Sequence, residues 1–161
     1  MFPPAIVSGG QTGADRAALD FAIARNIPHH GWCPRGRSGE DGWIPQKYLL
    51  HETPEADPRQ RTEWNVRDSD GTVIFSMAET LSGGTAFTRE MALSYGKPLL
   101  ELRGARSVAD NAAALRQFLA QHKIKTLNVA GPKASEEPGI ENWVREILET
   151  EMALPPSKSL P

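Results

Sequence analysis

The strongest constraint on the fold is an alternation of short apolar runs with segments of helical periodicity. Ala5–Val7 is followed by a helical pattern that ends near Asn26, and apolar runs at residues 72–75, 98–100 and 126–130 are each followed by a further helical pattern. A short strand is also predicted at residues 29–32. Strands that alternate with helices are typical of a parallel sheet with helices on both faces. The sequence therefore predicts an α/β fold: a single Rossmann-like, doubly wound domain with about five strands.

The length of the chain limits how many domains it can form. With 161 residues, 39% of them hydrophobic, it can bury one core and is too short for two ordinary domains. We expect the domain to cover residues 1–154 and a disordered tail to cover residues 155–161, where two prolines interrupt the last helical pattern. In sequence numbering, the preferred strand order is 2-1-3-4-5, which places the ligand crevice between the first and third strands.

Charge and cysteine content exclude several classes of protein. The formal net charge of −2 provides no overall basic field for nucleic acid or an anionic membrane, so neither is an expected partner. The single cysteine, Cys33, cannot form an internal disulfide. No stretch resembles a signal peptide or a membrane span, and a cytoplasmic location is expected. The histidines lack zinc-binding spacing, so no metal site is predicted.

A glycine-rich loop separates the first strand from the first helix. Gly9, Gly10 and Gly13 would let backbone amides approach a ligand, and the helix that follows would direct its positive end at an anion such as phosphate. Thr12 and Asp15 have the spacing of a capping box, which predicts a helix start at about Gly13. The spacing matches neither the dinucleotide fingerprint nor a Walker A loop. The alternative interpretation is a tight turn without a ligand.

A second loop of the same kind, Ser82–Gly83–Gly84–Thr85, opens the helix after the third strand. Its amides and hydroxyls would supply further donors on the other side of the predicted crevice. Taken alone, this loop could also be a simple turn. The occurrence of two such loops favours a phosphate-binding crevice between them.

The segment after residue 32 carries two arginines and the cysteine in a long loop rich in glycine and proline. Arg35 and Arg37 flank Gly36, and guanidinium groups can hold phosphate or molybdate by paired hydrogen bonds. Exposed arginines of a surface loop are the alternative. Cys33 could be activated by these arginines or bind a soft metal, although a small buried core residue is the commoner role for such a thiol.

A helix predicted from Asp57-Pro58 to about Ser69 would contribute polar side chains to the crevice. Arg61 and Asn65 lie one helical turn apart and could cover the ligand. In the alternative interpretation, Arg61 forms ion pairs with nearby carboxylates. Glu90 is the one carboxylate placed to act beside the second glycine loop, unless it is simply a solvated helix residue.

Five separated motifs occur in an order that resembles the molybdenum carrier family, the molybdenum cofactor carrier-like proteins. They are Ser-Gly-Gly-Gln-Thr-Gly-Ala-Asp-Arg-Ala-Ala-Leu-Asp at 8–20, Gly-Trp-Cys-Pro-Arg-Gly-Arg at 31–37, Glu-Asp-Gly at 40–42, Arg-Thr-Glu-Trp-Asn-Val-Arg-Asp-Ser-Asp at 61–70, and Ser-Gly-Gly-Thr at 82–85. The resemblance covers roughly residues 5–150. It implies a Rossmann-like subunit, frequently an oligomer, that protects or transfers molybdenum cofactor.

This family is similar to the cytokinin-activating phosphoribohydrolases, which cleave nucleoside monophosphates with an arginine and a glutamate near a Pro-Gly-Gly-x-Gly-Thr-x-x-Glu loop. Arg61 and Glu90 match those two positions approximately. However, Ser82, Ala86 and Phe87 replace the proline, the third glycine and the threonine of that loop. The altered loop favours binding over hydrolysis.

The sequence therefore predicts a binding protein for a phosphate-bearing small molecule, with molybdenum cofactor (molybdopterin) as the first candidate and molybdate or a nucleoside phosphate as others. A nucleoside monophosphate phosphoribohydrolase, with Arg61 and Glu90 as catalytic candidates, and a nucleotide-sensing module are the alternatives. Expected partners are molybdoenzymes and further copies of the chain. The predicted binding residues are Gly9, Gly10, Gln11, Thr12, Gly13, Arg16, Cys33, Pro34, Arg35, Gly36, Arg37, Arg61, Asn65, Ser82, Gly83, Gly84 and Thr85.

Overall fold

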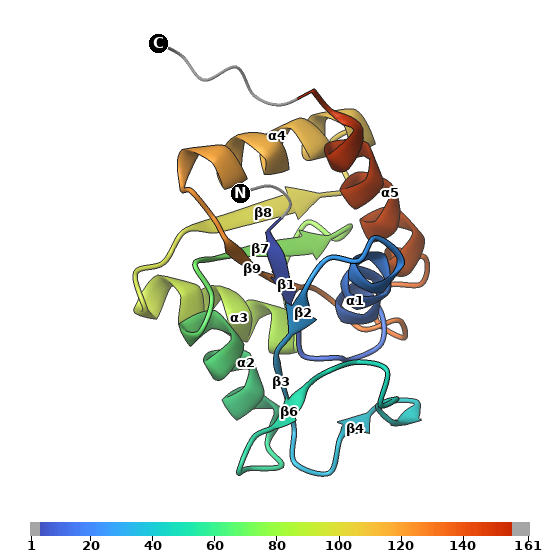
Figure 1. The fold of residues 1–161 in the computed structure, drawn as a ribbon, viewed down its shortest axis with the longest axis vertical. Coiled ribbons are helices and arrows are strands. Elements are labelled where there is room, and N and C mark those ends of the chain that lie inside the picture. The colour runs from blue at the N-terminus through green and yellow to red at the C-terminus, as the bar shows by residue number, and fades with distance from the viewer. Residues whose placement is uncertain (1–3, 156–161) are drawn as a thin grey trace.

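A five-stranded sheet, in which every neighbouring pair is parallel, forms the centre of the molecule (Figure 1). The structure is a computed structural model and describes residues 4–155, so the predicted tail beyond Pro155 lies outside the described residues. The predicted α/β, Rossmann-like fold class is confirmed. The strands of this sheet are β1 (Ala5–Val7), β2 (His29–His30), β7 (Gly71–Ser76), β8 (Leu99–Arg103) and β9 (Thr126–Ala130).

The predicted strand order is wrong at one point. The order is β2-β1-β9-β7-β8, so the last strand inserts between the first and third predicted strands. Asn128 of β9 is in register with Val7 on one side and with Thr72 on the other. Counted from β9, the order becomes 3-2-1-4-5, the usual doubly wound arrangement with its start moved to the end of the chain. The loop that follows β9 therefore lies at the centre of the carboxyl edge, where ligands bind in such sheets.

Two groups of helices cover the sheet. α1 and α4 each pack against α5, and α2 packs against α3, with the two groups on either side of the sheet (Figure 1). On α5, Ile140, Val144 and Ile147 are fully buried in the main core. Each such side chain contributes roughly 1.5–3 kcal/mol by leaving water. The helices are α1 (Ala14–Ala24), α2 (Pro58–Arg67), α3 (Gly83–Ser94), α4 (Val108–Gln121) and α5 (Ile140–Ala153).

The amino-terminal ends of α2 and α4 are set by capping residues close by in the sequence, whereas the start of α1 is not. Asp57 caps α2 by accepting from the amide of Arg59, with Pro58 in the first turn, and Ser107 caps α4 by accepting from the amide of Asp110. The predicted Thr12–Asp15 capping box is wrong, since the Thr12 hydroxyl accepts from the Ala134 amide of a distant loop. A tertiary contact has replaced the local cap.

The second predicted strand is broken at Gly31. Its φ is +146°, and a Cβ there would lie 2.2 Å from the carbonyl oxygen of Ser8, so only glycine permits this close approach. The chain then leaves the main sheet and forms two small sheets of its own. These contain β3 (Trp32–Cys33) beside β6 (His51–Glu52), and the antiparallel hairpin of β4 (Ser38–Gly39) and β5 (Gly42–Trp43).

A second, smaller core holds the long loop after β3. Cys33 is buried with Ile44, Tyr48 and Leu50 against Leu19 of α1. The loop predicted to be long and unstructured is therefore packed on the domain by its own apolar side chains. No helix among residues 4–155 is both long and apolar enough to cross a membrane.

Candidate functional site

A cavity of about 200 Å³ opens where the glycine loop after β1, the segment after β9 and helices α2 and α3 meet. It lies at the carboxyl edge of the parallel sheet, and residues of β9 contribute to its wall. Its lining is mixed in charge and contains both cations and carboxylates. The lining residues are Gln11, Asp15, Pro58, Arg61, Thr62, Asn65, Gly84, Thr85, Thr88, Asn128, Ala130, Gly131, Lys133 and Glu136.

The amino-terminal end of α3 enters this cavity without a cap. Ser82 stands at the N-cap position, but its side chain accepts no hydrogen bond from the helix. The first bond at this end runs from the amide of Ala86 to the carbonyl of Ser82. Among the described residues, no acceptor faces the amides of Gly83, Gly84 and Thr85. Gly84 and Thr85 line the cavity, whereas Gly83 is exposed, and the positive end of a 12-residue helix is thus directed at the cavity.

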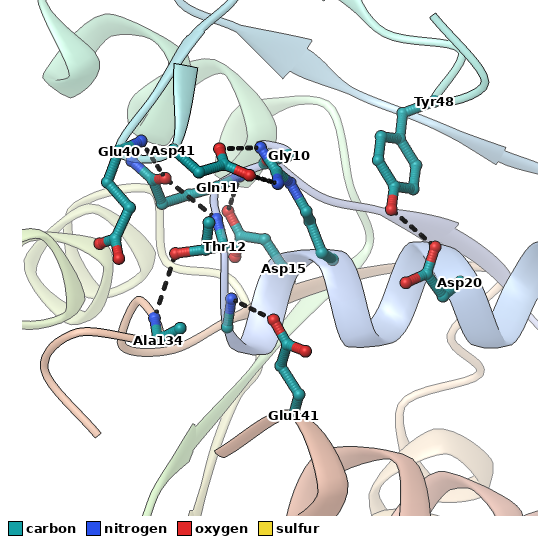
Figure 2. A network of polar contacts seen from close by, with 12 residues as sticks. Gly10, Gln11, Thr12, Asp15, Asp20, Glu40, Asp41, Tyr48, Ala134 and Glu141 are labelled. Atoms are coloured by element: carbon teal, nitrogen blue, oxygen red, sulfur yellow. Dashed lines mark hydrogen bonds and ion pairs between the residues drawn. The ribbon is translucent and has the colours of Figure 1, made fainter. Parts of the chain in front are cut away.

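The amino-terminal end of α1 is different, because protein groups already occupy its donors (Figure 2). Asp15 Oδ2 accepts from the Gln11 amide at 3.3 Å, and Glu141 Oε1 accepts from the Gly13 amide at 3.1 Å. The Ala14 amide donates to the carbonyl of Pro132 at 3.2 Å. The first glycine loop is therefore closed by carboxylates of its own chain, whereas the second is open.

Two cationic side chains line the cavity. Arg61 crosses from α2, and its Nη1 donates to the carbonyl oxygen of Gly9 at 3.0 Å. Lys133 comes from the loop after β9, with its Nζ 3.8 Å from Glu136 Oε1. Both line the same cavity as Gly84 and Thr85 of α3.

Asp15 places a buried carboxyl in the cavity wall. Burial raises its pKa from 3.8 to about 6, although Arg61, Arg16 and the amides of Gln11 and Gly9 oppose this increase. The carboxyl therefore titrates close to neutral pH. An anion in the same cavity would interact unfavourably with its charged form.

The cavity brings together five of the residues predicted from the sequence. Gln11, Arg61, Gly84 and Thr85 line it with groups that can donate to a ligand. Asn65 lines it too, but its side-chain amide accepts from Trp32 N at 2.8 Å and donates to Trp32 O at 3.0 Å. Asn65 thus fixes β3 to α2. Ser82 lines an adjoining cavity of about 120 Å³, which shares Thr85 and Glu136 with the first.

The arginines predicted to hold the anion have other positions. Arg37 donates to the carbonyls of four residues in its own loop, Ile44, Pro45, Tyr48 and Leu50. Arg16 is buried and donates to the carbonyl of Gly10 and to both carboxylate oxygens of Asp41.

The cysteine segment also lies outside the lining of the cavity. Cys33 is completely buried, and burial raises the pKa of its thiol, which opposes reactivity. Arg35 and Gly36 are exposed on the surface. Pro34 is buried beside them. Glu90 is exposed on α3 and does not line the cavity.

The glycines of the first loop make room for neighbouring segments of the protein. A Cβ on Gly10 would lie 2.6 Å from Leu50 Cδ1, and one on Gly13 would lie 2.4 Å from the carbonyl oxygen of Pro132. These glycines permit close packing between the first loop and two other loops. The hydroxyl oxygen of Thr12, beside them, accepts a hydrogen bond from the Ala134 amide and adds to this contact between loops.

Sequence reasoning missed the contribution of β9 and its loop. Asn128, Gly131, Lys133 and Glu136 line the cavity, and the strand order explains the omission, because β9 was expected at the sheet edge. A Cβ on Gly131 would lie 2.5 Å from the Phe75 carbonyl oxygen and 2.6 Å from Ala14 Cβ. A Gly-Pro-Lys sequence directly after a buried strand was the available signal. Asp15, Pro58, Thr62, Thr88 and Ala130 complete the unpredicted lining.

Metal-ligand geometry is also informative about the described part of the chain. Residues 4–155 contain no group of three or more histidine, cysteine or carboxylate side chains placed to hold a metal ion.

Comparison with known proteins identifies the family. Residues 6–152 match the circularly permutated YpsA SLOG family. The chain belongs to this family. Its description agrees with the strand order, which becomes regular when counting starts at β9. The chain is also similar to the crystal structure of a protein from Syntrophus aciditrophicus SB named "Putative molybdenum carrier protein", with 47% identity over 92% of this chain and 94% of that one and a TM-score of 0.91. No curated protein matches significantly.

The resemblance to the molybdenum carrier proteins, inferred from five motifs, is therefore confirmed at the level of family. Those motifs have two structural roles. The segments at 8–20, 61–70 and 82–85 contribute residues to the cavity, whereas those at 31–37 and 40–42 build the neighbouring small sheets.

Proposed function

We propose that the protein binds a phosphate-bearing small molecule, with the anion against the amino-terminal end of α3 and between Arg61 and Lys133. The observation that carries this proposal is the uncapped amino-terminal end of α3, where Gly84 and Thr85, with unpaired amides, line a cavity with two cationic side chains. Helix amino termini bind phosphate through such donors and the helix dipole. A neighbouring guanidinium adds a paired, charge-assisted contact.

Molybdenum cofactor is the first candidate ligand, and storage or delivery of it is the corresponding function. The 47%-identical protein is named as a molybdenum carrier, which supports this choice. The donors in the cavity suit the terminal phosphate of such a cofactor. Molybdate or a nucleoside phosphate would engage the same donors, because amides and cations recognise an oxyanion without reading what is attached to it.

The test is a titration of purified molybdenum cofactor, with inorganic phosphate as a competitor, against three proteins. Wild type should bind, Lys133→Met should lose at least about tenfold in affinity, and Arg35→Ala should match wild type, because Arg35 lies outside the cavity. Equal losses in both variants would overturn the proposed position of the anion. Absence of binding in wild type would overturn the proposed function.

A further inference from the structure

The orientation of the Gln11 side chain is fixed by two backbone donors. Its Oε1 accepts from the amide of Thr12 at 3.0 Å and from the amide of Glu40 at 2.9 Å (Figure 2). An NH₂ group cannot accept from N–H, so the oxygen must occupy this position. Among the described residues, Gln11 Nε2 has no hydrogen-bond partner, and the residue lines the cavity. The side chain therefore offers donors to a ligand and no acceptor.

The second of these donors comes from the β4–β5 hairpin. Ser38 pairs with Trp43 and Gly39 with Gly42, so Glu40 and Asp41 form its two-residue turn. The turn is brought close to the first loop by Gly39, where a Cβ would lie 2.9 Å from Arg16 Nη2 and 3.4 Å from Gln11 Oε1. A side chain at residue 39 would displace the contact.

The turn is anchored on both sides. Asp41 forms a bidentate ion pair with Arg16, in which Nη2 donates to Oδ1 at 2.8 Å, and Arg16 is itself fixed to the carbonyl of Gly10 at 3.0 Å. The Arg16 guanidinium lowers the pKa of the Asp41 carboxyl, so the pair stays charged at neutral pH.

On the other side, Glu40 accepts from the amide and the hydroxyl of Ser135, at 3.2 and 2.8 Å. Ser135 belongs to the loop after β9, two residues from Lys133. The turn therefore joins the first glycine loop to the loop that carries a cation of the cavity.

We propose that Gln11 is a specificity-determining residue which donates from Nε2 to an oxygen of the bound anion, and that Glu40 is a positioning residue which holds this amide through its backbone N–H. This inference rests on the proposed function and adds the atom that reads the ligand. The site would then accept oxyanions at this point and discriminate against ligand groups that present N–H. The hairpin acts on binding only through Gln11.

The experiment measures inorganic phosphate affinity by calorimetry in Gln11→Met, Glu40→Ala, Glu40→Pro and the two double variants that combine Gln11→Met with each Glu40 change. Gln11→Met removes the donor at similar length, and we expect at least about a tenfold loss, as for a hydrogen bond to a charged group. Glu40→Ala removes the carboxylate that accepts from Ser135 but keeps the backbone N–H that donates to Gln11. Glu40→Pro removes both the carboxylate and this backbone N–H. Because φ of Glu40 is not positive, the turn is of neither primed type, and proline is favoured at the first central position of type I and II turns.

We expect Glu40→Pro to bind more weakly than Glu40→Ala, and the difference to vanish when both are made in the Gln11→Met protein. A difference that persists there would overturn the positioning role. Unchanged affinity in Gln11→Met would overturn the donor role, and this variant decides the matter even if Glu40→Pro does not fold. If Lys133→Met loses phosphate binding and Gln11→Met keeps it, this inference is refuted and the proposed function stands. If the wild-type protein does not bind, both are refuted.

Discussion

The guanidinium of Arg61 lies directly over Gly9. Its Nη1 donates to the carbonyl oxygen of Gly9 at 3.0 Å, and a Cβ on Gly9 would lie 2.6 Å from the same nitrogen. The glycine thus provides space for an arginine that lines the cavity. The sequence predicts Gly9 as a binding residue, and in the structure Gly9 positions Arg61, which lines the cavity.

Gly9→Ala should displace the Arg61 guanidinium and weaken phosphate binding while leaving the fold intact. The clash involves the far end of a flexible side chain, which can move at low cost. Calorimetry with inorganic phosphate should show that Gly9→Ala and Arg61→Met each reduce affinity and that the double variant loses no more than Arg61→Met alone. Additive losses would show that Gly9 acts independently of Arg61.

Gly10→Val should destabilise the protein, contrary to what the sequence suggests. A phosphate cradle would make this change affect binding and spare the fold, but the Cβ would meet Leu50 and Ile44 of the smaller core. The φ of +78° adds backbone strain of about 1–3 kcal/mol for a β-branched residue. Denaturant unfolding should show the loss, and Leu50→Ala in the same chain should recover part of it. A Gly10→Val protein with wild-type stability and no phosphate binding would instead support a phosphate cradle in the first loop.

The Asp15 carboxyl should make stability depend on pH between about 4 and 6. Its pKa is raised from 3.8 to about 6, so in this range the folded protein holds a proton that the unfolded chain has released. Stability from this group is present below pH 4 and is lost as the pH rises to about 6, by on the order of 3 kcal/mol.

Asp15→Asn, which cannot ionise, tests this directly. The difference in unfolding free energy, variant minus wild type, should rise by that amount between pH 4 and pH 7 when measured by urea denaturation. A difference that stays constant with pH would show that Asp15 ionises normally.

Arg37 and Arg35 should differ sharply in their effect on stability. Arg37 donates to four backbone carbonyls that hold the loop of residues 44–50, whereas Arg35 is exposed. Arg37→Met should cost about 2–4 kcal/mol, because buried acceptors lose their donor, and Arg35→Met should cost less than about 0.5 kcal/mol. Similar thermal unfolding midpoints for the two variants would exclude the structural role of Arg37.

The features that the sequence predicts correctly depend on residues close together in the chain, and those that it misses depend on residues far apart. Asp57 was recognisable at a helix start because a cap depends on residues only two or three positions away. The glycine-led start of α3 was equally local. The Thr12 contact with Ala134, the Glu141 contact with Gly13 and the pairing of β9 with β1 join segments more than 100 residues apart. No local pattern encodes these.

The candidate site was predicted in the same uneven way. Arg61 and Thr85 reach the cavity because their helices begin where the sequence indicated. Lys133 was missed because its importance depends on β9 being central. The structural role of Arg37 was not predictable, because the four carbonyl oxygens to which it donates come together only when the loop folds.

Amide chemical shifts report directly whether the amino-terminal amides of α3 hold the bound anion. A titration of the 15N-labelled protein with inorganic phosphate should be followed by two-dimensional NMR, which suits a chain of 17.6 kDa. We expect the largest, saturable shifts at the amides of Gly83, Gly84 and Thr85, which lack acceptors. If the largest shifts occur at Gly10 and Gly13 of the first loop and those three amides do not move, the anion is not held by α3.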